Sequence, residues 1–167
     1  VRERVKWAME AVGLDFNEMK DRQTFALSGG QKRKVALAGI LSLKPKVLVL
    51  DEPTAGLDPI SSQELLDQMK RLNKDGNLTI VFVSHNMEEV AALADRIYVM
   101  ANGTVVLSGT PKQIFTDRLN MKKYNIGTPE TVKVLYQLEE KGYLVRTDAF
   151  SVSEASQEVI KVLSQKN

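Results

Sequence analysis

The sequence contains no cysteine and only one histidine, His85. A disulfide framework and a thiolate zinc site are therefore impossible, and a metal cage built from several histidines is excluded as well. No apolar run reaches the length of a membrane span, and no signal peptide is visible. From these absences we expect a soluble, cytoplasmic protein.

The chain has 167 residues, which is the size of one domain or of most of one domain with an appendage. Its apolar content of 43% is sufficient for a packed core and argues against disorder. The net charge of +2 is too small to predict a nucleic-acid or anionic-membrane partner. Because the chain opens on Val1 in a segment that already has a helical pattern, we expect a fragment of a longer protein.

The rest of the chain is organised around residues 47–52, four apolar residues followed by Asp51 and Glu52. The continuous apolar run predicts a strand buried on both faces of a parallel sheet. Ligands of such sheets bind beyond the carboxyl ends of the strands. Two acids at that edge suit a hydrated Mg²⁺ and a water molecule to be activated. The alternative interpretation is a strand followed by a charged turn.

A second feature lies upstream, where Ser28 and Gln31 have the spacing of a capping box at the start of an apolar helix. An ordinary buried helix would have this start, but Gly29 and Gly30 destabilise it unless a ligand must approach the backbone closely. Free N–H groups, the helix dipole and a hydroxyl together favour an anion such as phosphate. The basic residues 32–34 are interpreted as a solvated helix face.

Downstream, Asp58 is a predicted N-cap, with Pro59 at the first helical position. Residues 78–83 predict a second buried strand after a turn at Asp75-Gly76, and this strand ends just before His85. Parallel pairing would place His85 at the same sheet edge as the two acids. Before the capping box, residues 15–26 are predicted to be irregular. After His85 we expect a helix (86–93), a hairpin that turns at Asn102-Gly103 and a short helix after Gly109. The end of the chain is predicted to contain a helix from Thr128 to Gly142, a short extended piece (143–145) and a last helix capped by Ser153.

Residues 27–31 (Leu-Ser-Gly-Gly-Gln) resemble the signature motif of ATP-binding cassette (ABC) ATPases. The resemblance continues in the family's order and spacing through the Walker B strand (47–51), the catalytic carboxylate (Glu52), the turn and D-loop (53–58) and the switch histidine (His85). One such motif arises by chance, whereas this ordered set is specific.

The resemblance implies an α/β fold: a partial P-loop NTPase core that lacks the Walker A half, with a small α+β C-terminal extension. Residues 1–115 would be the C-terminal part of the ABC ATPase domain, and residues 116–167 the extension. The hairpin and the Gly109-Thr110-Pro111 ending resemble importer-type ATPases. The tail is similar to that of energy-coupling factor transporter ATPases, the CbiO-like subunits of cobalt and vitamin uptake, where it helps hold two ATPases together.

The resemblance also assigns roles. Asp51 would hold Mg²⁺ through water, Glu52 would polarise the attacking water and His85 would sense the γ-phosphate. The nucleotide-binding residues would be Ser28, Gly29, Gly30, Gln31 and Asp58. ATP and Mg²⁺ would be bound at the cytoplasmic face of the membrane, with a second ATPase subunit and transmembrane subunits as partners and no nucleic acid.

The sequence contains no Gly-x-x-x-x-Gly-Lys-Ser/Thr loop, whose N–H groups and lysine cradle phosphates. We therefore expect the isolated chain to be inactive, and its sheet to be exposed or covered by a companion segment. Two other classes stay open. In SMC or DNA-repair ATPases the signature half is a separate C-terminal lobe, although no heptads precede Leu27 here. A non-catalytic dimerising module is the other, although Glu52 and His85 are intact.

Overall fold

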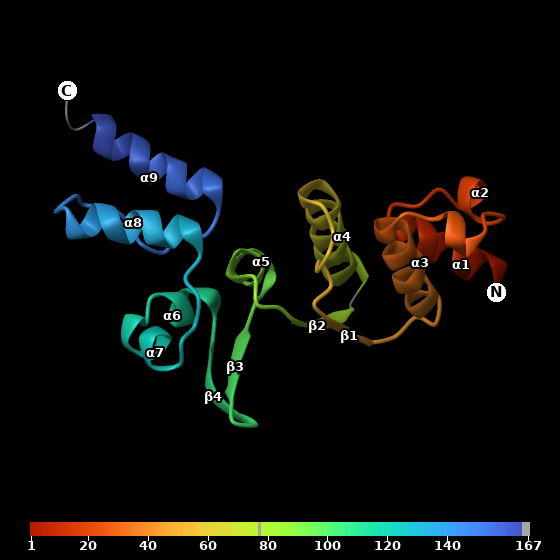
Figure 1. Cartoon of the computed structure of the whole chain (residues 1–167), viewed down its shortest axis with the longest axis horizontal. Helices are drawn as coiled ribbons and strands as arrows, with labels where there is room; N and C mark the ends of the chain where they lie inside the picture. Colours follow the sequence, from red (N-terminus) through yellow and green to blue (C-terminus); the bar gives the residue numbers. More distant parts are fainter. Residues whose placement is uncertain (77, 165–167) are drawn as a thin grey trace. The chain divides into compact units, whose positions relative to one another are not determined.

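The computed structural model describes residues 1–76 and 78–164 (Figure 1). The chain divides into two compact units, Val1–Val83 and Ser84–Asn167. The predicted boundary between residues 115 and 116 stays a prediction, because compactness alone does not identify an extension to a family domain. Among the described residues, no helix has the length and apolar character needed to cross a membrane.

The first unit is a small α/β layer. Its elements are α1 (Arg2–Ala11), α2 (Phe16–Met19), the 3-10 helix η1 (Thr24–Ala26), α3 (Gly29–Leu41), β1 (Val47–Asp51), α4 (Pro59–Gly76) and β2 (Thr79–Val83). One apolar cluster joins α1, α3, β1 and α4, and it includes Ala8, Val12, Leu41, Leu48 and Leu65.

Two predictions for this unit were wrong. The stretch 15–26, predicted as irregular, contains α2 and η1, because the Asp15 side chain accepts a hydrogen bond from Glu18 N at 2.9 Å and so starts a short helix. Asp75 and Gly76, predicted as a turn, are the last residues of α4. A glycine suits a helix end as well as a turn, so the sequence alone did not separate the two.

β1 and β2 form a parallel pair, as predicted, in which Val47 lies opposite Thr79 and Asp51 opposite Val83. One face of the pair packs on the core through Leu48, Leu50, Ile80 and Phe82. The other face is exposed, with exposed fractions of 55% for Val47, 67% for Val49, 48% for Val81 and 55% for Val83. The prediction that β1 is buried on both faces was therefore wrong, because successive side chains point to opposite faces and the described residues cover only one. The expectation of an exposed sheet is confirmed.

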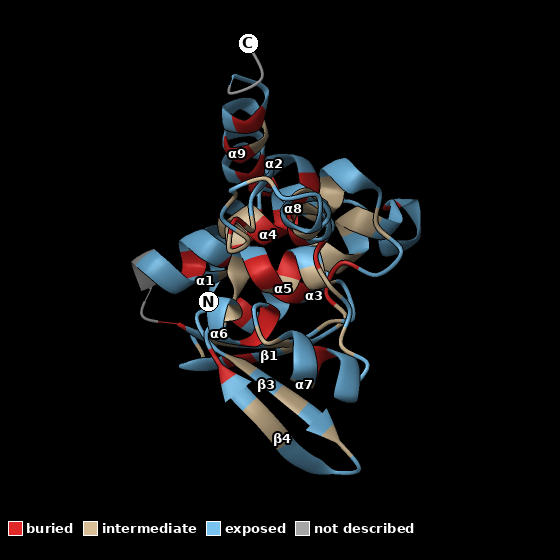
Figure 2. Cartoon of the chain, turned by 90° about the vertical axis from the view of Figure 1, so that its left-hand side faces the viewer, coloured by how far each residue is buried: buried red, intermediate tan, exposed pale blue. Residues whose placement is uncertain are grey.

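The second unit contains α5 (Met87–Leu93), β3 (Ile97–Ala101), β4 (Thr104–Gly109), α6 (Pro111–Phe115), α7 (Arg118–Lys123), α8 (Glu130–Glu140) and α9 (Val152–Ser164). β3 and β4 are antiparallel, and the turn residues Asn102 and Gly103 have φ of 50° and 76°. These left-handed values are typical of the predicted two-residue hairpin turn. Figure 2 shows most of the hairpin in tan and pale blue, so most of it is not fully buried.

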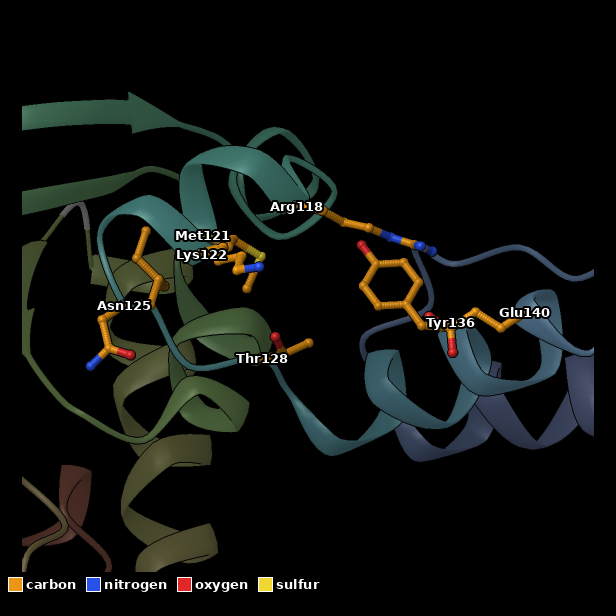
Figure 3. A pocket seen from close by; sticks show the side chains of 8 residues that line it. Arg118, Met121, Lys122, Asn125, Thr128, Tyr136 and Glu140 are labelled. Carbon is orange, nitrogen blue, oxygen red and sulfur yellow. The ribbon is translucent and has the colours of Figure 1, made fainter.

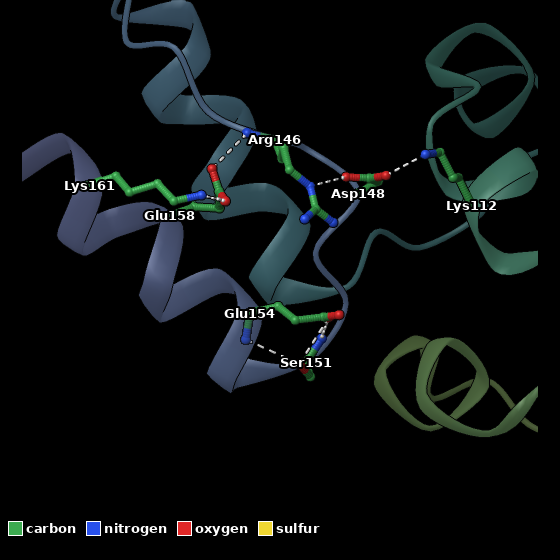
Figure 4. Close-up of polar contacts among 7 residues, drawn as sticks. All are labelled: Lys112, Arg146, Asp148, Ser151, Glu154, Glu158 and Lys161. Atoms are coloured by element: carbon green, nitrogen blue, oxygen red, sulfur yellow. Dashed lines mark hydrogen bonds and ion pairs between the residues drawn. The ribbon is translucent and has the colours of Figure 1, made fainter.

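The end of the second unit is a pair of helices, α8 and α9, which lie side by side (Figure 1). Ser151, and not the predicted Ser153, caps α9: its hydroxyl accepts from Glu154 N at 3.2 Å, and the Glu154 carboxylate accepts from Ser151 N at 3.2 Å (Figure 4). Ser151 has a glutamate three residues later to complete the box, whereas the residue three positions after Ser153 is Ser156.

The segment between α8 and α9 contains no strand and is fixed by ionic contacts (Figure 4). Glu158, only 5% exposed, accepts from Arg146 N at 3.1 Å and from Lys161 Nζ at 2.5 Å. Asp148 bridges Arg146 Nε at 3.1 Å and Lys112 Nζ at 2.6 Å. Hydrogen bonds from Lys112 and then Arg146 lower the pKa of Asp148. These contacts therefore stabilise the folded chain above the ordinary aspartate pKa, and this stabilisation is lost as the pH falls through the lowered pKa of Asp148.

Leu41 and Leu43 provide a matched test of the first core, because Leu41 is 1% exposed and Leu43 is 77% exposed. Leu41→Ala should lower the free energy of unfolding by about 2–5 kcal/mol, because it leaves a cavity in the core. Leu43→Ala should change it by less than about 0.5 kcal/mol. Urea unfolding followed by fluorescence of Trp7, the single tryptophan, measures both values. Equal effects of the two substitutions would contradict this description of the core.

Candidate functional site

The start of α3 is a solvent-exposed capping box, as predicted. Gln31 N donates to Ser28 Oγ at 3.2 Å, and Ser28 N donates to Gln31 Oε1 at 3.0 Å. Ser28 and Gly29 are exposed, and a Cβ built on Gly29 would meet no atom within 4 Å. The start of α3 is therefore open to solvent at Gly29, and exposed helix starts are sites at which phosphate can bind.

Glu52 follows the last residue of β1 and has the left-handed φ of 45°. Its N–H donates to Val83 O at 2.9 Å, which ties it to the end of β2. Its carbonyl accepts from Ala55 N at 3.2 Å, and Leu57 N donates to Thr54 O at 3.1 Å. The residue thus sits on a tight turn at the carboxyl edge of the sheet. Left-handed non-glycine residues are uncommon and occur preferentially at functional sites.

The basic residues after the capping box are not all solvated, which corrects the interpretation of 32–34. The Arg33 guanidinium donates to Ala55 O at 2.6 Å and to Glu52 O. Lys34 pairs with Glu64 of α4 at 2.7 Å, and its side chain is only 14% exposed. Lys32 alone of the three matches the prediction, with an exposed side chain. The face of α3 that carries Arg33 and Lys34 is turned toward the Glu52 turn and α4.

Asp58 caps α4, as predicted. Its carboxylate accepts from Ile60 N at 3.1 Å, from Ser61 N at 3.0 Å and from Ser61 Oγ at 2.6 Å. The Ser61 hydroxyl, followed by its N–H, holds the pKa of Asp58 below its ordinary value of 3.8. A Cβ built on Gly30 would lie 3.7 Å from Ser61 Oγ, so the starts of α3 and α4 are neighbours.

The first unit thus brings together most of the predicted site residues. The start of α3 carries Ser28, Gly29, Gly30 and Gln31, the turn carries Glu52, and the start of α4 carries Asp58. Asp51 is the exposed last residue of β1. His85 belongs to the second unit, two residues after β2, and its role as a phosphate sensor stays a prediction.

The described residues supply only part of the ligands that a divalent cation needs. Among the described residues, no group of three or more His, Cys, Asp or Glu side chains could hold a metal ion alone. Mg²⁺ ordinarily takes one or two carboxylates and completes its shell with water and substrate phosphates. An exposed Asp51 at the sheet edge fits that share of the coordination.

A shallow pocket of about 290 Å³ in the second unit contains none of the predicted site residues (Figure 3). Its most prominent cation, Arg118, lies 3.6 Å from the centre of the Tyr136 ring and pairs with Glu139. Since the guanidinium already has these partners, we assign no function to this pocket. It is lined by Arg118, Met121, Lys122, Asn125, Ile126, Thr128, Tyr136 and Glu140.

Comparisons with known proteins agree with this geometry. Residues 1–55 match the family model described as ABC transporter. The chain superposes on cbiO1 of Clostridium perfringens, part of the ABC transporter complex cbiONQ, with a TM-score of 0.64 and 38% identity over 81% of this chain and 53% of that one. It also superposes on the dimeric structure of MJ0796, a bacterial ABC transporter cassette, with a TM-score of 0.57 and 27% identity over 66% of this chain and 47% of that one. The chain therefore belongs to the ABC ATPases and corresponds to their C-terminal part.

Within that family, the chain matches the energy-coupling factor transporter ATP-binding proteins. It is 42% identical to the protein EcfA2 of Clostridium tetani over 166 residues, which are 99% of this chain and 58% of that relative. The predicted resemblance is thereby confirmed. The chain spans little more than half the length of this curated relative.

The hydroxyl of Ser61 provides a test of the Asp58 geometry. Ser61→Ala should raise the pKa of Asp58 toward 3.8, because the hydroxyl is the strongest of the groups that lower it. A carboxyl whose pKa is lowered by folding stabilises the folded chain above its ordinary pKa, and this stabilisation is lost as the pH falls through the lowered pKa. Without the shift, the stability of the variant should depend less on acid pH. Titration of the Asp58 carboxyl carbon by NMR measures the shift. Ser62→Ala is the control, and equal pKa values in both variants would contradict the assignment.

Proposed function

We propose that this chain is the C-terminal part of an ATP-binding and ATP-hydrolysing subunit of an ABC importer. The subunit powers the uptake of a cobalt ion or a vitamin-type substrate through membrane partners. The observation that carries the proposal is the placement of the start of α3, the Glu52 turn and the start of α4 side by side in one compact unit. The names of the relatives, which are energy-coupling factor transporter ATP-binding proteins, support an ATP-binding role in such a transporter. The cobalt or vitamin substrate is what the family resemblance implies.

In the proposed mechanism two ATPase subunits stack head to tail. Ser28, Gly29, Gly30 and Gln31 of one subunit cover the γ-phosphate of ATP that is held by the Walker A loop of the other. The exposed start of α3 and the open space at Gly29 suit this task. Asp58 contacts the partner across the interface while it caps α4. The dimeric structure of the related cassette MJ0796 supports the assembly.

Hydrolysis then depends on the sheet edge. Glu52 acts as the general base that polarises the attacking water, and the hydrogen bonds of the turn hold the backbone from which its side chain extends. His85 senses the γ-phosphate from the segment that follows β2. Asp51 would hold Mg²⁺ through water, and the positive charge supplied there would offset the negative charge of the phosphates. Most of the acceleration comes from positioning and from charge stabilisation in a site closed to water.

The subunit acts as a peripheral protein at the cytoplasmic face of the membrane, bound to transmembrane transporter subunits. Residues 1–115 belong to the ATPase domain, and residues 116–167 form an extension that helps hold the two ATPases together. Opening and closing of the dimer drives the membrane subunits. The membership of the relative cbiO1 in the complex cbiONQ supports such an assembly.

The first prediction of this proposal concerns the isolated chain. It should show no binding heat at micromolar ATP, because it contains no Walker A loop to cradle the phosphates. A longer chain that restores the N-terminal half of the cassette should bind ATP, and it should also cover the exposed apolar face of β1 and β2. Isothermal titration calorimetry of both chains measures the difference. Micromolar affinity of the isolated chain would sink the prediction.

The second prediction concerns the base. In the complete subunit, Glu52→Gln should lower kcat by about 10²–10⁴-fold, because the amide cannot accept the proton of the attacking water. ATP should still bind, so the variant should accumulate as a closed, ATP-loaded dimer. Phosphate release and gel filtration with ATP report the two properties. Glu10→Gln, on the exposed face of α1, is the control; near-normal turnover of the Glu52 variant would remove Glu52 from the role of base.

A further inference from the structure

We infer that Arg33 is a positioning residue for Glu52. The guanidinium reaches from α3 to two backbone carbonyls of the turn, those of Glu52 and Ala55, and so holds the backbone from which the Glu52 side chain extends. The inference rests on the proposed function, in which Glu52 is the general base. It deepens that function by naming the group that holds the base in place.

The geometry shows a clamp on both sides of one residue. On the β2 side, Glu52 N donates to Val83 O at 2.9 Å. On the α3 side, Glu52 O accepts from Arg33, which also donates to Ala55 O at 2.6 Å. A planar guanidinium with several fixed N–H groups can bind two carbonyls at once, whereas a lysine ammonium acts as a single point charge. The peptide groups before and after Glu52 are thus held by different elements.

Such a clamp matters because Glu52 has a conformation that a non-glycine residue avoids. With φ at 45°, the turn lies in the sparsely populated left-handed region and persists only where its surroundings enforce it. A change in this backbone conformation would swing the carboxylate. Misplacing a reacting group by about 1 Å can lower a rate by about 10²-fold.

Arg33 also links the start of α3 to the Glu52 turn. Arg33 is two residues after Gln31, the last residue of the capping box, and is part of the same helix. Displacement of the start of α3 is therefore transmitted to the Glu52 turn through the guanidinium. Arg33 touches no reacting group in the proposed mechanism, so its removal should affect kcat and leave the KM for ATP nearly unchanged.

The neighbouring residues provide controls. Lys34 is unsuitable because it pairs with Glu64. Lys32 precedes Arg33 on the same helix, has a positive charge and is exposed, so Lys32→Ala removes a charge without touching the turn. Arg33→Lys keeps the charge at position 33 but loses the fork that binds two carbonyls.

The test uses the complete ATPase subunit and five variants, of which one is a double variant. Arg33→Ala should lower kcat by about 10–100-fold with a change in KM below about twofold. Arg33→Lys should recover part of the loss, and Lys32→Ala should behave as the unsubstituted protein. In the Glu52→Gln background, Arg33→Ala should lower kcat no further, because a residue that acts through Glu52 has nothing left to position. Additive losses, or an Arg33→Ala protein with normal kcat, would overturn the inference.

Hydrogen exchange separates positioning from folding in the same proteins. Arg33→Ala should speed exchange of the Ala55 amide, which donates to Glu52 O, without changing exchange in the core of α1. If Arg33→Ala unfolds the subunit, kcat and the exchange of the Ala55 amide are measured on Arg33→Lys, and the same changes are expected to a smaller extent. Near-normal turnover of Glu52→Gln marks failure of the proposed function, whereas an inactive Glu52→Gln with unchanged exchange and kcat in the Arg33 variants marks failure of this inference alone.

Discussion

The parallel pairing of β1 with β2 is the constraint on which the rest of the candidate site depends. Because Asp51 lies opposite Val83, the strands end together, and Glu52 N can donate to Val83 O at 2.9 Å. That hydrogen bond holds the first residue beyond the sheet against the neighbouring strand. A register shift by one residue would turn Leu48 and Leu50 to solvent and separate the turn from its anchor.

The same pairing explains why the chain combines an ordered site with an uncovered sheet. The buried face of the two strands contributes to the core that α1, α3 and α4 complete. The opposite face presents valines, which are β-branched and favour strands, but nothing in the described part of the chain packs on them. Apolar strand surface of this kind favours association with another polypeptide. It is consistent with a chain that spans 58% of a relative's length.

Local features of the fold could be predicted from the sequence, because their donors and acceptors are neighbours along the chain. The Ser28 and Gln31 box, the Asp58 cap and the Asn102-Gly103 turn all depend on groups within four residues of one another. Ser151 was missed, since a second serine two positions later competed with it in the pattern. The alternation of burial along β1 was missed for another reason: a run of apolar residues does not reveal how many layers cover a strand.

The contacts of Arg33 lay beyond sequence reasoning altogether. Its acceptors are backbone carbonyls 19 and 22 residues away, and any residue type supplies such an acceptor. Three consecutive cations therefore resembled a solvated face, although the helix turns two of them toward polar partners. The family motifs predict the residues of the candidate site, but they do not predict what holds those residues in place.

One physical consequence follows for the proposed dimer. In the proposed mechanism, the start of α3 covers the nucleotide held by the partner, whereas Glu52 acts on the nucleotide held by its own subunit. In this chain Arg33 joins the two by direct hydrogen bonds. In the proposed dimer, docking of one subunit's helix start on the partner's phosphate would therefore be coupled to the turn that carries the Glu52 of the same subunit. A coupling of this kind needs no long pathway, because one side chain bridges the helix and the turn.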